Sequence, residues 1–106
     1  INNYGIMDTI TTGKNSSLTL NNYGTVKNEV RLGENGTAVI NNYKGAYIKD
    51  VIGGDITDKN SQKGINATNY GEIHYIKTGA YSTNEVFNYG DGSHVNISLD
   101  GKITHK

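Results

Sequence analysis

Three histidines, His74, His94 and His105, are the side chains in this 106-residue chain best suited to proton transfer near neutral pH or to nitrogen ligation of a metal. Their spacing matches no His-x-x-x-His pattern, and the chain has no cysteine to complete a metal site or to form a disulfide. His74 stands between Ile73 and Tyr75, so strand alternation points its side chain away from a core. We therefore expect solvent-facing histidines, with no catalytic residue, no metal and no cofactor.

Four carboxylates, those of Asp50, Asp55, Asp58 and Glu72, are the next candidates for chemistry. A calcium loop needs several oxygen ligands at tight alternate spacing, and a glycoside hydrolase needs two carboxylates that face each other across a groove. The spacing favours neither, so a polysaccharide lyase or hydrolase is the least favoured of three functional hypotheses. If a ligand binds, the sequence places it beside the loop that contains Asp55, Asp58 and Lys59. The competing interpretation is a tolerated surface loop.

Four Asn-x-Ser/Thr triplets match the acceptor pattern for an N-linked glycan. A chain rich in Asn, Ser and Thr also produces such triplets by chance, so an intact mass of the native protein decides between the two interpretations. The triplets begin at Asn15, Asn35, Asn66 and Asn96.

The composition argues against several classes of partner. Ten basic side chains balance ten acidic ones, and no Lys/Arg run creates the positive patch that nucleic acids or anionic membranes attract. Apolar residues make up 34% of the chain, which predicts a thin core, while the neutral charge balance argues against disorder. No run of roughly eighteen apolar residues is present, so no membrane span is predicted in this segment.

An internal repeat predicts the elements that position these residues. The phrase Asn-Asn-Tyr-Gly at residues 2–5 returns with small changes around Tyr23, Tyr43, Tyr70 and Tyr89, so that the tyrosines follow one another at steps of 19, 20, 27 and 19 residues. A fixed period of this length indicates stacked units that cannot bury their apolar faces alone. A second glycine recurs nine or ten residues after the tyrosine, at Gly13, Gly33, Gly53 and Gly79.

Between the turns, apolar residues alternate with period two, as in residues 18–20 and 38–40, and no window carries a helical stripe. Strands this short gain stability when equivalent positions of successive units stack about 4.8 Å apart. The chain is therefore predicted to be all-β: a single-stranded parallel β-helix, or β-solenoid, of about five coils of about 20 residues. We expect one domain over residues 1–106, with a looped insertion near 53–64 and a polar C-terminal cap at 91–106.

Each residue type of the turn phrase has a predicted structural role. The asparagine amide is expected to donate to the coil on one side and accept from the coil on the other, and to tolerate a left-handed backbone. The glycine supplies a positive φ. The tyrosines stack and shield the corner, with an aromatic strip for binding sugars as the alternative. This structural turn ladder comprises Asn3, Tyr4, Gly5, Asn22, Tyr23, Gly24, Asn42, Tyr43, Asn69, Tyr70, Gly71, Asn88, Tyr89 and Gly90.

Segments 18–26 (Leu-Thr-Leu-Asn-Asn-Tyr-Gly-Thr-Val) and 36–43 (Gly-Thr-Ala-Val-Ile-Asn-Asn-Tyr) resemble the coils of bacterial filamentous-haemagglutinin-type adhesins and autotransporter passengers. Those families carry repeats of about 20 residues of the form Leu-x-Leu-x-Asn-x-Gly-x-Ile. The resemblance covers most of the chain and is clearest through residue 52. It implies a right-handed parallel β-helix that is extracellular or at the cell surface, exported by a type V route, with a role in adhesion or biofilm formation.

Together these patterns predict a structural or adhesive β-solenoid segment of a secreted or cell-surface bacterial protein. Its expected partners are itself, adjoining coils of the same chain, or a host-surface glycan or protein. The leading alternative is a self-assembling fibre subunit, amyloid-like or pilus-like, because the first residues are already in repeat phase and solenoid ends leave unpaired strand edges. Ice binding would need paired threonines at one repeat position, and the threonines do not recur there.

Overall fold

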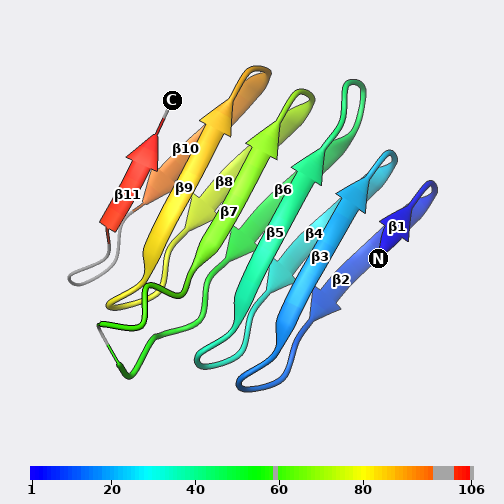
Figure 1. Ribbon diagram of the computed structural model, residues 1–106. Coiled ribbons are helices and arrows are strands. Elements are labelled where there is room, and N and C mark those ends of the chain that lie inside the picture. The colour runs from blue at the N-terminus through cyan, green and yellow to red at the C-terminus, as the bar shows by residue number, and fades with distance from the viewer. Residues whose placement is uncertain (59, 97–101, 106) are drawn as a thin grey trace.

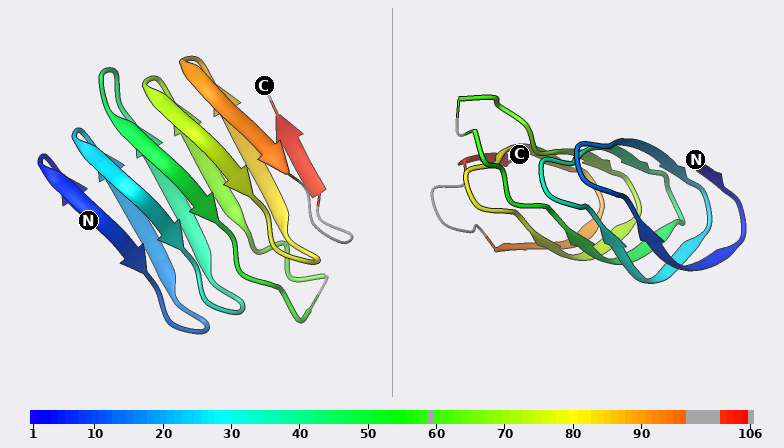
Figure 2. Two further views of the ribbon diagram at one scale, coloured as in Figure 1. Left: turned by 180° about the vertical axis from the view of Figure 1, so that it is seen from behind. Right: turned by 90° about the horizontal axis from the view of Figure 1, so that it is seen from below.

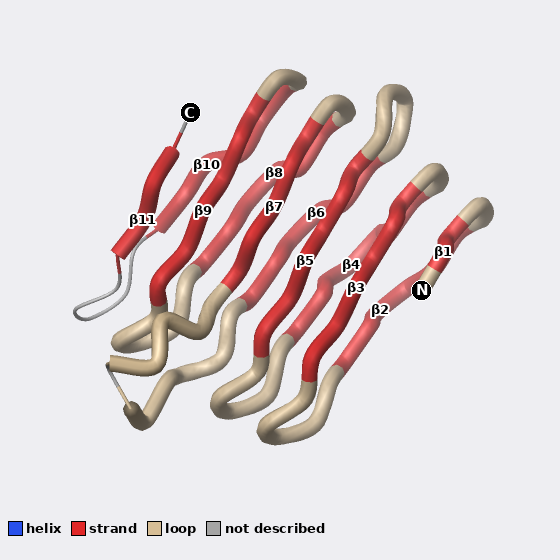
Figure 3. Tube along the Cα trace, in the orientation of Figure 1, coloured by secondary structure: helices blue, strands red, loops and turns tan. Residues whose placement is uncertain are grey.

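The computed structural model describes residues 1–58, 60–96 and 102–105, with backbone alone described beyond residue 90. This part of the chain forms eleven strands joined by turns and loops, with no helix (Figures 1 and 3). The strands are β1 (Asn2–Asn3), β2 (Ile6–Thr11), β3 (Ser17–Asn22), β4 (Thr25–Arg31), β5 (Thr37–Asn42), β6 (Tyr47–Ile52), β7 (Ile65–Asn69), β8 (Glu72–Lys77), β9 (Thr83–Asn88), β10 (Asp91–Asn96) and β11 (Lys102–His105).

The strands form two parallel sheets. Sheet A has the order β1-β3-β5-β7-β9-β11, and sheet B has the order β10-β8-β6-β4-β2. Consecutive strands alternate between the sheets, so each strand pairs with strands two places away in the chain, always in parallel. Figures 1 and 2 show the two sheets lying against each other along the whole molecule. The all-β prediction is confirmed, and parallel strands in two sheets fit a β-solenoid.

The core is a thin layer of aliphatic side chains between the sheets. On sheet A, Leu20 pairs in register with Ile40, and Ile40 pairs with Ala67; all three are fully buried. The smallest extent of the molecule is 17 Å, which leaves room for one layer of side chains between two sheets. The equivalent buried column of sheet B is Val26, Ile48 and Ile73.

Sheet B departs from the period-two alternation predicted for it. Ile73 and Ile76 are both fully buried, whereas His74 is exposed and Tyr75 is half-buried. The prediction that Tyr75 shares the core face with Ile73 is therefore wrong. β6 and β8 place two residues between their buried positions, and β4 places three, where strict alternation places one.

The long third repeat step arises at two places. Two residues, 23 and 24, separate Asn22 from β4, whereas four residues, 43–46, separate Asn42 from β6. Loop 53–64 supplies the rest of the added length and projects beyond the neighbouring loops (Figures 1 and 2). Sequence analysis placed all of the added residues in 53–64, while the register assigns two of them to the turn.

The last two strands extend both sheets. β10 pairs in parallel with β8, and β11 pairs in parallel with β9. The segment predicted as a polar cap, 91–106, therefore contains backbone that continues the stack, while residues 97–101 and 106 lie outside the described residues.

Candidate functional site

A row of asparagine side chains runs along the edge where sheet A turns into sheet B. We call Asn3, Asn22, Asn42, Asn69 and Asn88 the asparagine ladder. In each of the first four, Nδ2 donates a hydrogen bond to the Oδ1 of the next asparagine, at 2.8–2.9 Å. The structure thus brings the asparagines of the predicted turn ladder into one column.

Asn22 shows how each amide is used. Besides its bond to the next asparagine, its Nδ2 donates to the carbonyl oxygens of Gly24 and Tyr47, both at 3.1 Å. Its Oδ1 accepts from the Asn3 amide at 2.9 Å and from the Gly24 backbone N–H at 3.3 Å. One side chain therefore joins three successive units. Its backbone does not have the left-handed conformation expected of it.

The turn glycines are required for close approach of the backbones. A Cβ on Gly24 would collide with the carbonyl oxygen of Gly5, and a Cβ on Gly90 would collide with that of Gly71. The expectation of a positive φ at these glycines is wrong. Among the described residues, Gly45 is the one glycine with a positive φ, at 85°.

Left-handed residues instead occupy the opposite edge, where loops lead from sheet B back to sheet A. They are Asn15, Asn35, Gln62 and Tyr81, with φ between 57° and 59°. Sequence analysis missed this position. The available signal was that Asn15 and Asn35 each stand two places after a recurrent glycine.

The second column of glycines also needs one correction. A Cβ on Gly54 would collide with the Gly33 carbonyl oxygen, and a Cβ on Gly79 would collide with that of Gly54. Gly54, and not the predicted Gly53, therefore stacks between the equivalent glycines of the neighbouring units. The sequence alone could not show which glycine stacks, because Gly53 and Gly54 are adjacent.

The tyrosine rings of the turns form two stacked columns. Tyr4, Tyr23 and Tyr43, the first tyrosine column, have ring centroids 4.9 and 4.4 Å apart and interplanar angles of 5° and 1°. Tyr70 and Tyr89, the second tyrosine column, lie 5.0 Å apart at 14°. Because neighbours cover both faces of the Tyr23 ring, this ring does not offer an open face on which a sugar could stack. The geometry favours mutual stacking over a sugar-binding strip.

The phenols of the first tyrosine column also interact at their tips. A hydrogen bond with Tyr43 raises the pKa of the Tyr23 phenol above its ordinary value. Reduced solvation and the phenols of Tyr43 and Tyr4 act in the same direction. Tyr23 is therefore neutral throughout the physiological pH range.

The longer turn of the third unit separates the two columns. Residues 43–46 form a β-turn closed by a hydrogen bond from the Ala46 N–H to the Tyr43 carbonyl, at 2.9 Å. Gly45 holds the second central position, where a positive φ is required. Among the described residues, no ring stack joins Tyr43 to Tyr70.

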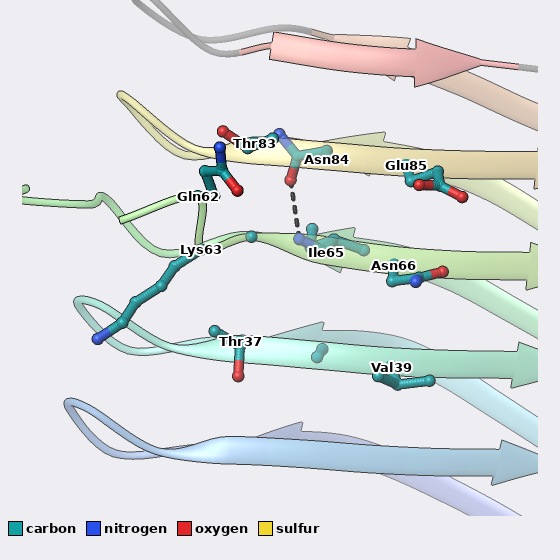
Figure 4. A pocket seen from close by; sticks show the side chains of 11 residues that line it. Thr37, Val39, Gln62, Lys63, Ile65, Asn66, Thr83, Asn84 and Glu85 are labelled. Atoms are coloured by element: carbon teal, nitrogen blue, oxygen red, sulfur yellow. Dashed lines mark hydrogen bonds between the residues drawn. The ribbon is translucent and has the colours of Figure 1, made fainter. Parts of the chain in front are cut away.

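A shallow groove of about 360 Å³ lies on the outer face of sheet A (Figure 4). Gly64 lines the groove, and a Cβ there would collide with the Thr83 carbonyl oxygen. Glu85 is the one carboxylate of the lining, and Figure 4 shows the Lys63 side chain extending away from it. The groove therefore lacks the paired carboxylates of a glycosidase. Its lining comprises Thr37, Ala38, Val39, Gln62, Lys63, Gly64, Ile65, Asn66, Thr83, Asn84 and Glu85.

A buried amide lies beneath this groove. Asn84 is 4% exposed and faces inward. Beside it on the neighbouring strand lies Ile65, whose apolar side chain is also buried. Its Oδ1 accepts from the Ile65 N–H at 2.9 Å, drawn as the dashed line in Figure 4, and its Nδ2 donates to the Ser82 hydroxyl at 2.8 Å. Sequence analysis missed Asn84, because it lies outside the repeated turn phrase.

The two sheets differ in charge. The described side chains of sheet A strands include one charged residue, Glu85. The outward positions of sheet A are instead mainly Ser, Thr and Asn, with the exposed Val39. The sheet B strands β2, β4, β6 and β8 carry Asp8, Lys27, Glu29, Arg31, Lys49, Asp50, Glu72 and Lys77.

The carboxylates of the predicted ligand-facing loop are used within the protein. The Asp55 carboxylate accepts from the Ala80 backbone N–H at 2.8 Å, and the Asp58 carboxylate accepts from the Asn60 N–H at 3.0 Å. Lys59 lies outside the described residues. In the part of the chain that the structure describes, no group of three or more His, Asp or Glu side chains could hold a metal ion.

The predicted histidine and glycan-acceptor positions are scattered over the molecule. His74 is exposed on β8, as its predicted orientation requires, and the side chains of His94, His105 and Asn96 lie outside the described residues. Asn15 and Asn66 are exposed, in a turn and on sheet A respectively. Asn35 is half-buried, and its Oδ1 accepts from the Thr57 N–H at 2.9 Å.

Comparisons with known proteins found no matching family model, curated protein or solved structure. Within the described residues there is no helix of the length and apolarity that a membrane span requires. The stacked corners and the outer face of sheet A, on which Glu85 is the one charged residue among the described side chains, are the observations that bear on function.

Proposed function

We propose that the chain is a β-solenoid, a single-stranded parallel β-helix of about five coils of about 20 residues, and that it serves as a structural or adhesive segment of a secreted or cell-surface bacterial protein. The observation that carries this proposal is the asparagine ladder, in which each amide bonds to the next through all of the turns. Side chains that join every unit to its neighbours suit a rigid rod better than a reaction centre.

In this proposal the outer face of sheet A makes the adhesive contact. The outward side chains of Ser17, Thr19 and Thr37 carry no charge, and Val39 is 45% exposed. Covering such a face costs less desolvation than covering the charged face of sheet B. A host-surface glycan or an uncharged protein surface has the matching chemistry, and the groove at Gly64 lies on the same face.

A matched pair of variants tests the adhesive face. Thr19→Lys places a charge on sheet A, and Thr9→Lys makes the same change at an exposed position of sheet B. We expect Thr19→Lys to reduce binding of the purified protein to host-cell surfaces, while Thr9→Lys leaves it unchanged and both variants melt near the parent temperature. Equal binding by all three proteins would remove sheet A from the adhesive role.

A self-assembling fibre subunit is the second candidate, and the in-register parallel pairing of successive units favours it. Equivalent residues such as Leu20 and Ile40 pair between neighbouring units. A strand of a second copy can continue the same pairing at an exposed sheet edge. Filaments of constant width in electron micrographs would support this function, and a monodisperse monomer by light scattering at high concentration would contradict it.

A further inference from the structure

The tyrosine columns place reactive phenols at fixed, short separations. Tyr23 and Tyr43 have ring centroids 4.4 Å apart in nearly parallel planes, and the Tyr43 phenol raises the pKa of Tyr23. The ring carbons next to each hydroxyl are therefore neighbours across two successive turns. Tyr4 and Tyr89 are 74% and 64% exposed, so both columns are open to a reagent from solvent.

We propose that the two tyrosine columns are modification sites, at which a haem-peroxidase-type oxidant with hydrogen peroxide forms dityrosine cross-links between successive turns. Each of two neighbouring phenols loses one electron and one proton. The two radicals then join through a new carbon–carbon bond between the ring carbons next to the hydroxyls. The hydrogens of those carbons move to the oxygens and restore both phenols, while hydrogen peroxide takes up the two electrons and two protons and becomes water.

The fold favours coupling within a column because it holds the partners together before oxidation. Reacting groups that are already held close and oriented avoid the entropy cost of finding each other. The asparagine ladder fixes the backbone directly before each ring; the Asn22–Asn42 bond, at 2.9 Å, adjoins the Tyr23–Tyr43 pair. Coupling of column tyrosines should therefore precede coupling between molecules in dilute solution.

The interrupted stack makes the expected connectivity specific. Links are expected for the pairs Tyr4–Tyr23, Tyr23–Tyr43 and Tyr70–Tyr89, which are stacked. The turn at 43–46 separates the columns, so a Tyr43–Tyr70 link is not expected. Tyr47 and Tyr81 belong to neither column, and among the described residues neither is in a ring stack.

A peroxidase reaction on the purified monomer at low concentration tests the proposal. Dityrosine fluorescence should appear in the monomer fraction, with a loss of two hydrogen atoms per link in the intact mass. Lysine or arginine residues separate all five column tyrosines, so trypsin places each on a different peptide. Tandem mass spectrometry then separates Tyr89 from Tyr81, and Tyr70 from Tyr75, which share tryptic peptides. Links confined to dimers, or equal yields at Tyr47 and Tyr81, would overturn the proposal.

Two conservative variants separate this chemistry from a change in folding. Tyr23→Phe keeps a ring in the first column but removes its phenol, so both links of that column should disappear while Tyr70–Tyr89 persists. Tyr47→Phe is the matched control and should leave all three links at the parent yield. If Tyr23→Phe melts like the parent and the peptides of Tyr4 and Tyr43 still cross-link at the parent yield, the column does not direct the reaction.

Discussion

At the scale of single residues, the buried Asn22 amide is the clearest example of a side chain replacing backbone interactions. It is fully buried and bonds to both adjacent asparagines and to two carbonyl oxygens. Its neighbour Asn21 also lies in an amide chain, through Asn2 and Asn41 at 3.0 Å, but that chain runs on the outer surface. The two positions therefore share chemistry and differ in burial.

Asn22→Ala is expected to lower the free energy of unfolding by about 1–3 kcal/mol, because it leaves buried polar groups unpaired. Asn21→Ala should cost about 0.5–1 kcal/mol, since water can satisfy the exposed partners. Chemical denaturation of both variants measures the difference. Equal losses would show that burial of the ladder does not matter.

Gly24→Ala tests the close approach of successive turns. Its added Cβ would collide with the Gly5 carbonyl oxygen, whereas a Cβ on Gly5 meets nothing within 4 Å. Overpacking of this kind costs about 1–3 kcal/mol, so Gly24→Ala should unfold at lower temperature. Gly5→Ala should stay within about 0.5 kcal/mol of the parent. A melt in which the two variants coincide would contradict the collision.

The raised pKa of Tyr23 predicts a loss of stability in alkali. The folded state holds the Tyr23 proton more tightly than the unfolded chain does, because of the hydrogen bond with Tyr43. This contribution is complete below the ordinary pKa of 10.0 and disappears as the pH rises through the higher folded value. Tyr23→Phe should therefore lose less stability than the parent between neutral pH and pH above 10, as urea denaturation at several pH values would show. An identical pH dependence would contradict the linkage.

At the scale of elements, the sequence predicts the strands better than it predicts their connections. Leu20 and Ile40 each stand directly before an Asn-Asn-Tyr phrase, and they pair in register in the structure. The repeat predicts this pairing because in-register stacking brings equivalent residues of successive units into one column. The joint burial of Ile73 and Ile76 was not predicted, because strict period-two alternation places residues three positions apart on opposite faces of a strand. The close contacts of the glycines were not predicted either, because they depend on the backbone of a neighbouring unit and not on local φ preferences.

The turn at 43–46 gives a prediction at this scale. Deleting Lys44 and Ala46 leaves Asn42-Tyr43-Gly45 directly before β6, which restores the length of the turn at Asn22-Tyr23-Gly24. The Tyr43 ring should then stack on Tyr70 and join the two columns. Cross-relaxation between the two rings in the NMR spectrum of the variant would report this contact. A variant that folds with the rings still apart would mean that the turn does not cause the interruption.

At the scale of the whole molecule, the alternation of strands between two sheets predicts which deletions the fold accepts. Asn22 and Asn42 are equivalent positions of consecutive units. Removing residues 23–42 joins Asn22 to Tyr43, so that Asn22 takes the place of Asn42 and the alternation is kept; β3 can then pair with β7, and β2 with β6. Removing residues 23–32 instead runs β3 into β5, two strands of sheet A, with no sheet B strand between them.

The whole-unit deletion should therefore fold cooperatively, because a stack of similar units loses only one unit and its interfaces. Its denaturant m-value should fall by roughly a fifth, in proportion to the surface exposed on unfolding. The half-unit deletion should give a broad transition, since its apolar faces no longer lie on one side of each strand. Circular dichroism during urea titration measures both. Equally cooperative unfolding of the two variants would contradict a solenoid. A periodic stack keeps its alternation of strands when a whole unit is removed and loses it when half a unit is removed.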